Sequence, residues 1–147
     1  MSASAIMQET QRILAAAVPE ASVVLGIPAT FVSNNTLYLY HDGSSDVVKA
    51  APNVIRRTHI IPFHLLLYVA DGADEQALEV QLLTFHDRIT NLFYANHRLN
   101  GTAAMCAVAQ RDGAALTPVQ YVLDMQQRYR HRSWTLSAME DLNPTFA

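Results

Sequence analysis

The sequence predicts a single α+β domain, in which an antiparallel or mixed sheet of about five strands carries two helices packed on one face. Residues 55–69 form a long apolar run whose alternate positions separate into two faces, as they do in a strand. Residues 74–96 repeat apolar side chains at steps of three and four, which is typical of an amphipathic helix. The full order of helix, strands, helix, strands favours helices grouped on one side of a sheet.

The central strand and the helix that follows it have the clearest patterns. We assign one strand face to Ile61, Phe63, Leu65, Leu67 and Val69, and the other to Pro62, His64, Leu66 and Tyr68. The apolar stripe of the helix consists of Leu78, Leu82, Phe85, Ile89, Leu92 and Phe93. The dipeptide Asp71-Gly72 breaks the strand. Asp74 and Glu75 then supply negative charge where a helix N-terminus favours it, and Gly101 is expected to end the segment.

The flanking segments predict the remaining elements. Before the central strand we expect a helix capped by Ser2 or Ser4 and ended by Pro19, a broken edge strand over 23–25 and 29–32, a strand over 36–40 and a long polar loop over 41–53. After the central helix we expect a strand over 102–110, a polar connection over 111–118, and strands over 121–129 and 131–139 that join tightly or form one bent strand. Residues 1–139 then form one domain, and residues 140–147 a tail that is disordered or docks on a neighbour.

The composition indicates a protein that associates with other chains. Half of the residues are hydrophobic and only 16% are charged, so we expect another chain to cover part of the apolar surface. The net charge of −3 does not favour nucleic acid. No apolar run reaches the roughly 18 residues of a membrane span. The first residues lack the pattern of a secretion signal, so we expect the protein to stay where it is made.

No residue pattern predicts catalysis or metal binding. A Gly-x-Ser-x-Gly elbow, a Gly-rich phosphate loop and a His-Glu-x-x-His motif are all missing from the sequence. His59 and His64 point to opposite strand faces. His86 and His97 lie about three helical turns apart, so neither histidine pair can share a metal ion. Cys106 lies in an apolar run and is interpreted as a buried, inert thiol. We therefore expect a protein that is not an enzyme and needs no cofactor or metal.

Three arginines alternate along the last strand segment: Arg128, Arg130 and Arg132. In an extended chain they line one strand face at intervals of about 7 Å. One interpretation is an edge strand protected by solvated charge. The other is a contact with a neighbouring subunit or with phosphates. The acidity of the whole chain and the lack of interleaved exposed aromatic residues weigh against nucleic acid.

The back of the central helix carries apolar side chains as well. Val80, Leu83 and Tyr94 lie about 140–200° from the apolar stripe by the 3.6-residue period. Either a second layer of the same domain covers them, or they belong to a subunit interface. A chain with only two helices has little left to form a second layer, which favours the interface.

The order of these features resembles a known family. An N-terminal helix precedes the segment IPATFVSNNTLYLY, a long loop and the segment RRTHIIPFHLLLYVADG. The helix EVQLLTFHDRITNLFYANHRLNGT and a closing pair of strands ending in RHRSWTLSAME follow. Over residues 1–139 this order resembles the tail terminator proteins of long-tailed bacteriophages, the minor tail protein U type. The helix running into NHRLNGT matches their Asn-x-x-Leu-x-Gly-like stop.

The resemblance implies a structural virion protein without catalytic activity. Such proteins form a ring, usually a hexamer, that stops tail-tube growth at the head-proximal end and joins the tube to the head-completion complex. The implied partners are copies of itself, the tail tube protein and the head-completion or connector protein, with no membrane and no sequence-specific nucleic acid. The implied location is the virion, after assembly in the host cytoplasm. Because a closed ring needs heterologous contacts, we hypothesise that the arginine strand meets an acidic loop from Asp42 to Asp46 on the next copy.

Three alternatives stay open. Another neck or head-closure adaptor of the virion has similar partners but a different position in the particle. A small oligomeric α+β binding module or enzyme subunit predicts a deep pocket with convergent polar groups. A DNA-contacting protein predicts an affinity that falls steeply with salt.

Overall fold

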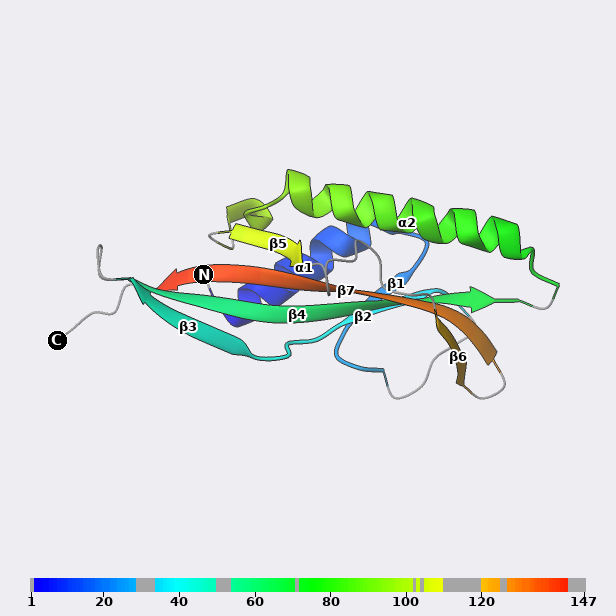
Figure 1. The fold of residues 1–147 in the computed structure, drawn as a ribbon, viewed down its shortest axis with the longest axis horizontal. Helices are drawn as coiled ribbons and strands as arrows, with labels where there is room; N and C mark the ends of the chain where they lie inside the picture. The colour runs from blue at the N-terminus through cyan, green and yellow to red at the C-terminus, as the bar shows by residue number, and fades with distance from the viewer. Residues whose placement is uncertain are drawn as a thin grey trace.

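The chain forms two helices on one face of a mixed sheet, which confirms the α+β class (Figure 1). A computed structural model describes residues 2–28, 34–49, 54–70, 72–101, 103, 105–109, 120–124 and 127–142. The helices are α1 (Ala3–Ala17), α2 (Glu75–Ala95) and the short 3-10 turn η1 (Leu99–Gly101). The strands are β1 (Ser22–Leu25), β2 (Thr36–Leu39), β3 (Ser44–Lys49), β4 (Val54–Val69), β5 (Met105–Ala109), β6 (Gln120–Asp124) and β7 (Gln127–Leu142).

Seven described strands form the sheet, in the spatial order β1-β2-β4-β7-β5. β1 is parallel to β2, and the other described pairs are antiparallel. Two strands pair with successive segments of β4: β3 with residues 54–59 and β2 with residues 63–66. Two others pair in the same way with β7: β6 with residues 127–131 and β5 with residues 135–139. The mixed sheet agrees with the sequence prediction, whereas the number of strands exceeds the expected five.

Strand β3 lies inside the segment 41–53, so the prediction of a long loop there is wrong for residues 44–49. Ser44 is opposite His59 in the register with β4, and Lys49 is opposite Val54. Small and polar side chains have weak strand propensity, but an adjacent strand provides hydrogen-bond partners for the backbone whatever the side chains are. The predicted strand at 29–32 and the predicted connection at 111–118 lie outside the described residues.

Strand β7 corrects two further predictions. The sequence predicted strands over 121–129 and 131–139 that join tightly or form one bent strand. β7 continues through Arg130, which agrees with the second form, but the division between strands falls between Asp124 and Gln127. The sequence also predicted that residue 140 begins a tail, yet β7 extends to Leu142. β7 is paired with β4 from Arg128 to Leu142. This long antiparallel partner, which cannot be inferred from the local pattern, keeps the strand extended.

The helix starts follow the predicted caps. The Ser2 hydroxyl accepts a hydrogen bond from the Ala5 N–H at 3.1 Å, and α1 begins at the next residue. The Asp74 carboxylate accepts one from the Gln76 N–H at 3.0 Å. Each cap satisfies one backbone donor that the first helical turn leaves unpaired.

One apolar core fills the space between the helices and the sheet. β4 contributes the predicted face, Ile61, Phe63, Leu65, Leu67 and Val69. α2 contributes Leu78, Leu82, Phe85, Ile89 and Phe93, with Leu92 partly buried against them. α1 contributes Ile6, Ile13 and Leu14. Because the β4 residues of this core all occupy odd positions, both helices lie on the same face of the sheet.

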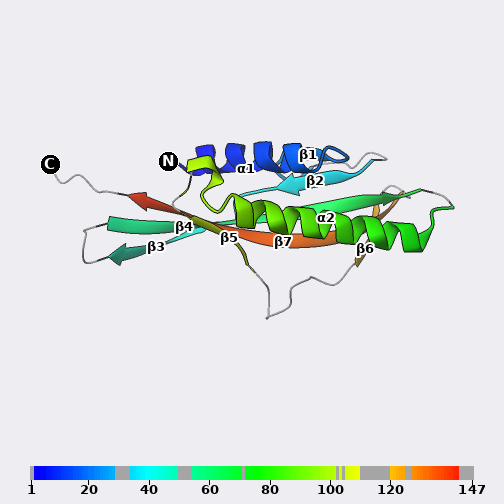
Figure 2. The same ribbon diagram turned by 90° about the horizontal axis from the view of Figure 1, so that it is seen from above.

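The sheet is longer than the two helices that cover it. β3 and the adjoining ends of β4 and β7 extend past both helices in two perpendicular views (Figures 1 and 2). Neither described helix is long and apolar enough to cross a bilayer.

Candidate functional site

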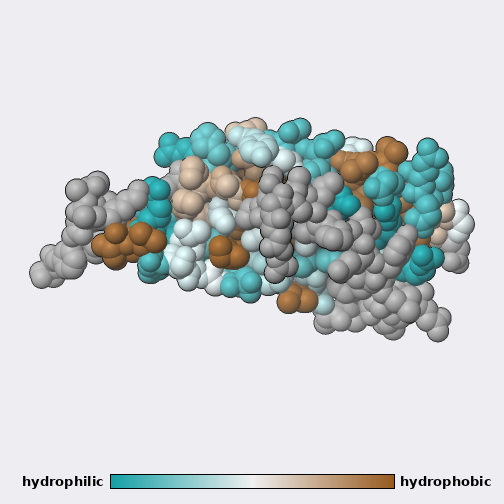
Figure 3. Space-filling view, viewed as in Figure 1, coloured by the Kyte–Doolittle hydropathy of each residue, from teal (hydrophilic) through white to brown (hydrophobic). Residues whose placement is uncertain are grey.

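The outer face of α2 presents apolar side chains to solvent. Val80 is 60% exposed, Leu83 39% and Tyr94 72%. They lie across the helix from the side chains that face the core, as the helical period predicts. Apolar surface over α2 is visible in the space-filling view (Figure 3). We call Val80, Leu83 and Tyr94 the α2 patch.

A second exposed apolar pair lies on β3. Val47 is 62% exposed and Val48 67%. β3 adjoins β4, on the opposite side of the β4–β7 pair from β5 and β6. We call these two valines the β3 patch, and they lie on the other side of the sheet from β5, the strand beside the end of α2. Because the two residues are adjacent in a strand, their side chains point to opposite faces of the sheet. The sequence analysis missed this patch because it placed these residues in a loop.

The predicted acidic loop is partly used within the chain. Asp46 forms two hydrogen bonds with the Arg57 guanidinium, at 2.8 and 3.1 Å, and this contact lowers the pKa of the Asp46 carboxyl. Asp42 is exposed, and its backbone N–H donates to the Ile60 carbonyl at 2.8 Å. Of the two proposed acidic contacts, Asp42 is the one that stays available to another chain.

The three arginines share one strand face, as predicted, but that face points toward α2. Arg128 is exposed, whereas Arg130 is 7% exposed and Arg132 5%. An Arg130 Nη2–H donates to a Glu79 carboxylate oxygen on α2. The prediction of a solvent-facing arginine strand is therefore wrong for Arg130 and Arg132. β7 is a central strand beneath a helix, so its alternation alone could not indicate which face is covered.

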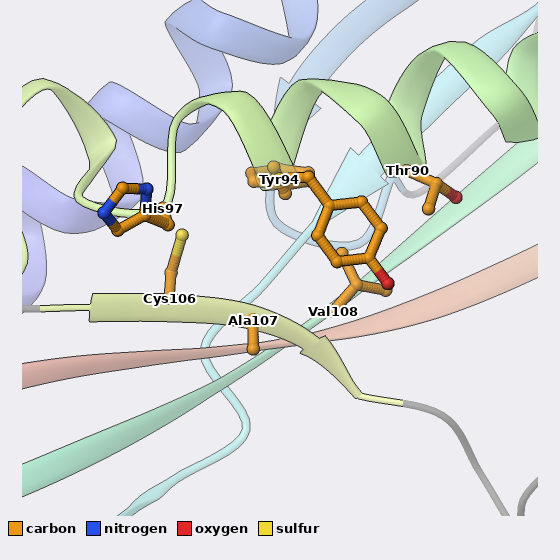
Figure 4. A pocket seen from close by; sticks show the side chains of 7 residues that line it. Thr90, Tyr94, His97, Cys106, Ala107 and Val108 are labelled. Atoms are coloured by element: carbon orange, nitrogen blue, oxygen red, sulfur yellow. The ribbon is translucent and has the colours of Figure 1, made fainter.

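A small cavity lies between the end of α2 and β5 (Figure 4). Its volume is about 250 Å³, and its lining includes Thr90, Tyr94, His97, Cys106 and Val108. The lining thus extends the α2 patch toward the sheet edge, with Tyr94 belonging to both.

Cys106 in this cavity is buried, as predicted. Its Sγ–H donates to the Asn96 carbonyl at 3.4 Å, and burial raises the pKa of the thiol to about 11. His97 lies beside it in the cavity lining (Figure 4), a neighbour that the sequence analysis did not identify. A thiol with a raised pKa carries little thiolate at neutral pH, and the thiolate is the nucleophilic form.

The histidines form two pairs that the sequence analysis did not predict. His59 lies between His41, at 2.9 Å, and the Glu140 carboxylate, at 2.8 Å. His59 and Glu140 are both buried. The sequence predicted no contact for His41 or His131, because strand register determines which residues lie beside them.

The second pair lies on the other face of the sheet. His64 Nδ1 and His131 Nε2 are 2.7 Å apart, and the His64 ring also stacks on Tyr38. Burial lowers the pKa of His64 to about 4 and also lowers that of His131. Within the described residues, no group of three or more His, Cys, Asp or Glu side chains could hold a metal ion.

Comparison with known proteins adds no relative. No protein-family model matches the chain, and no curated protein sequence matches it.

Proposed function

We propose that this chain is a structural virion-assembly protein that forms a closed ring with copies of itself. The ring caps the tail tube of a long-tailed phage, stops its polymerisation and joins it to the head-completion complex. The observation that carries the proposal is the exposure of the two apolar patches, one on α2 and one on β3.

The positions of the patches favour a ring over a two-fold dimer. A ring needs two different complementary surfaces on each copy, whereas a two-fold interface uses one surface twice. The β3 patch lies near one edge of the sheet, and the α2 patch continues into the cavity beside β5 at the other edge. We therefore place the α2 patch of one copy against the β3 patch of the next. Asp42, two residues before β3, is an exposed acidic residue close to this contact in sequence.

The tail-terminator role itself rests on the family resemblance. The order of helix, strands, helix and strands underlies that resemblance, and the fold has this order. Association through exposed apolar side chains agrees with an assembly protein.

The ring is tested by measuring the native mass of the purified protein and imaging the particles by electron microscopy. We expect a closed oligomer for the wild-type chain. Val80→Glu, which places a charge inside the proposed contact, should shift the mass toward the monomer. Gln8→Glu is the matched control, because it adds the same charge at an exposed position of α1. A monomeric wild-type protein at every concentration would contradict the proposal, as would equal dissociation of the two variants.

The position of the ring in the virion needs a second experiment. Mixed with purified tail tube protein, a terminator should cap tubes at one end and stop their elongation. A head-closure adaptor should leave tube growth unchanged. The cavity beside Cys106 is the observation that favours the second alternative, a binding module. Its volume of about 250 Å³ is below the roughly 300 Å³ at which small-molecule sites begin.

A further inference from the structure

Two arginines beneath α2 share a single carboxylate. Arg130 and Arg132 are opposite the core residues Leu67 and Leu65 in the register with β4, so their side chains share the core face of the sheet. Both are more than nine-tenths buried. Glu79 is the carboxylate that pairs with Arg130. Among the described residues, this pair of arginines has one ion pair, the one between Arg130 and Glu79.

Most of the donors of these guanidinium groups have no acceptor. The Nε and Nη1 atoms of Arg130 and of Arg132 are fully buried and lack a hydrogen-bond partner among the described residues. A buried charge without a partner is strongly unfavourable, and so is a buried donor without an acceptor. In native proteins such a group calls for an explanation, and a bound ion or ordered water is one of them.

The surroundings give this arginine pair a way to reach the surface. The Glu79 side chain is 46% exposed, so the ion pair with Arg130 opens to solvent on the side of α2. In the part of the chain that the structure describes, β6 pairs with β7 as far as His131 and β5 pairs with it from Thr135, and Arg132 lies between these two stretches. Guanidinium groups recognise carboxylate and phosphate groups through paired hydrogen bonds.

We propose that Arg130 and Arg132 form a binding site for an oxyanion, which enters beside Glu79 and accepts the N–H groups that Glu79 leaves unsatisfied. Two sources share this chemistry: a free oxyanion such as inorganic phosphate, or a carboxylate on a second copy of this chain. The site goes beyond the ring proposal, because a free anion could occupy it in a monomer.

Thermal unfolding during a phosphate titration, at an ionic strength kept constant with chloride, tests the site. Phosphate stabilises many proteins without specific binding, so variants must decide the result. With a free oxyanion, the wild-type midpoint rises and saturates, Arg132→Met abolishes the saturable rise, and Arg12→Met retains it. Arg12 is a suitable control because it is an exposed arginine that is also paired with a glutamate, Glu9. An equal, non-saturating rise in all three proteins means an adventitious ion only and overturns the proposal.

The native mass separates the two sources. If a carboxylate of a second copy occupies the site, phosphate competes with it, and both phosphate and Arg132→Met lower the mass of the oligomer while Arg12→Met does not. If neither the unfolding midpoint nor the mass responds specifically to phosphate and to Arg132→Met, the site does not exist. Loss of the ring after Val80→Glu alone leaves this result unaffected, so the two proposals can fail separately.

A second variant keeps the test decisive if Arg132→Met does not fold. Glu79→Gln removes the competing carboxylate but keeps the arginines. We expect it to reach its half-maximal phosphate response at a concentration roughly tenfold lower than the wild-type protein, because one repulsive charge is gone. An unchanged phosphate response in Glu79→Gln would overturn the oxyanion site.

Discussion

The two halves of the β4–β7 strand pair have the same backbone ladder but different side-chain contacts. The inner half, which includes Phe63 and Trp134, lies under α2. The Phe63 ring stacks on Trp134 with ring centres 5.3 Å apart and contacts Phe93 of α2 at 5.8 Å. Burial of aromatic and aliphatic surface stabilises this half.

The outer half, beyond both helices, depends on paired polar groups. Arg56 and Asp141 form two hydrogen bonds across the strands, at 2.8 and 3.1 Å. His59 and Glu140 form a buried contact at 2.8 Å. In this half the two strands stabilise each other through cross-strand polar pairs. The comparison teaches that one pair of strands can pack through apolar side chains along half its length and add buried and exposed polar pairs along the other.

The largest expected effect is a core truncation in the inner half. Phe63→Ala should lower the free energy of unfolding by about 3–5 kcal/mol, because it removes buried aromatic surface and leaves a cavity. Urea denaturation measures the loss. Ile60→Ala, a truncation of a partly exposed residue on the outer half, is the control and should cost less than half as much. Equal losses would mean that the two halves are packed alike.

A smaller effect is expected from the buried polar contact of the outer half. Glu140→Leu should destabilise the protein by about 2–3 kcal/mol, because the buried His59 ring then loses an acceptor. Combining it with His59→Leu should restore most of the stability, since replacing both partners by apolar groups removes the unpaired polar atom. A double variant that is as unstable as the sum of the two single variants would show that the contact is not the cause.

The smallest expected effect concerns the face of the inner half that points away from the helices. His64, which faces His131, Tyr38 and Tyr40, has a pKa of about 4 in the folded chain against 6.5 normally. Between these values the unfolded chain binds more protons, so stability is complete above about pH 6.5 and decreases as the pH falls toward 4. We expect a loss of about 1–2 kcal/mol, less than the full shift implies because the ring is partly exposed.

Denaturation curves at several pH values measure this dependence. His64→Gln should flatten it between pH 4 and 6.5, whereas His97→Gln, at an exposed histidine, should not. Identical pH profiles for His64→Gln and the wild-type protein would assign the acid sensitivity to another group.

Local patterns were sufficient for the elements that pack against the core. The apolar face of β4 and the stripe of α2 follow from periods of two and of 3.6 residues, and both are found in the core. The exposed positions of Val80, Leu83 and Tyr94 follow from the same helical period. The cap at Asp74 follows from its side-chain chemistry.

Tertiary structure alone decided what depends on pairing between distant segments. Strand β3 exists because β4 lies beside it, and the alternation of Arg130 and Arg132 could not tell whether their shared face is solvent-exposed or lies under a helix. The pairing of His41 with His59 and of His64 with His131 depends on strand register. Period and capping are properties of neighbouring residues, so the sequence by itself determined them. Register and coverage depend on segments brought together by folding, which no local pattern records.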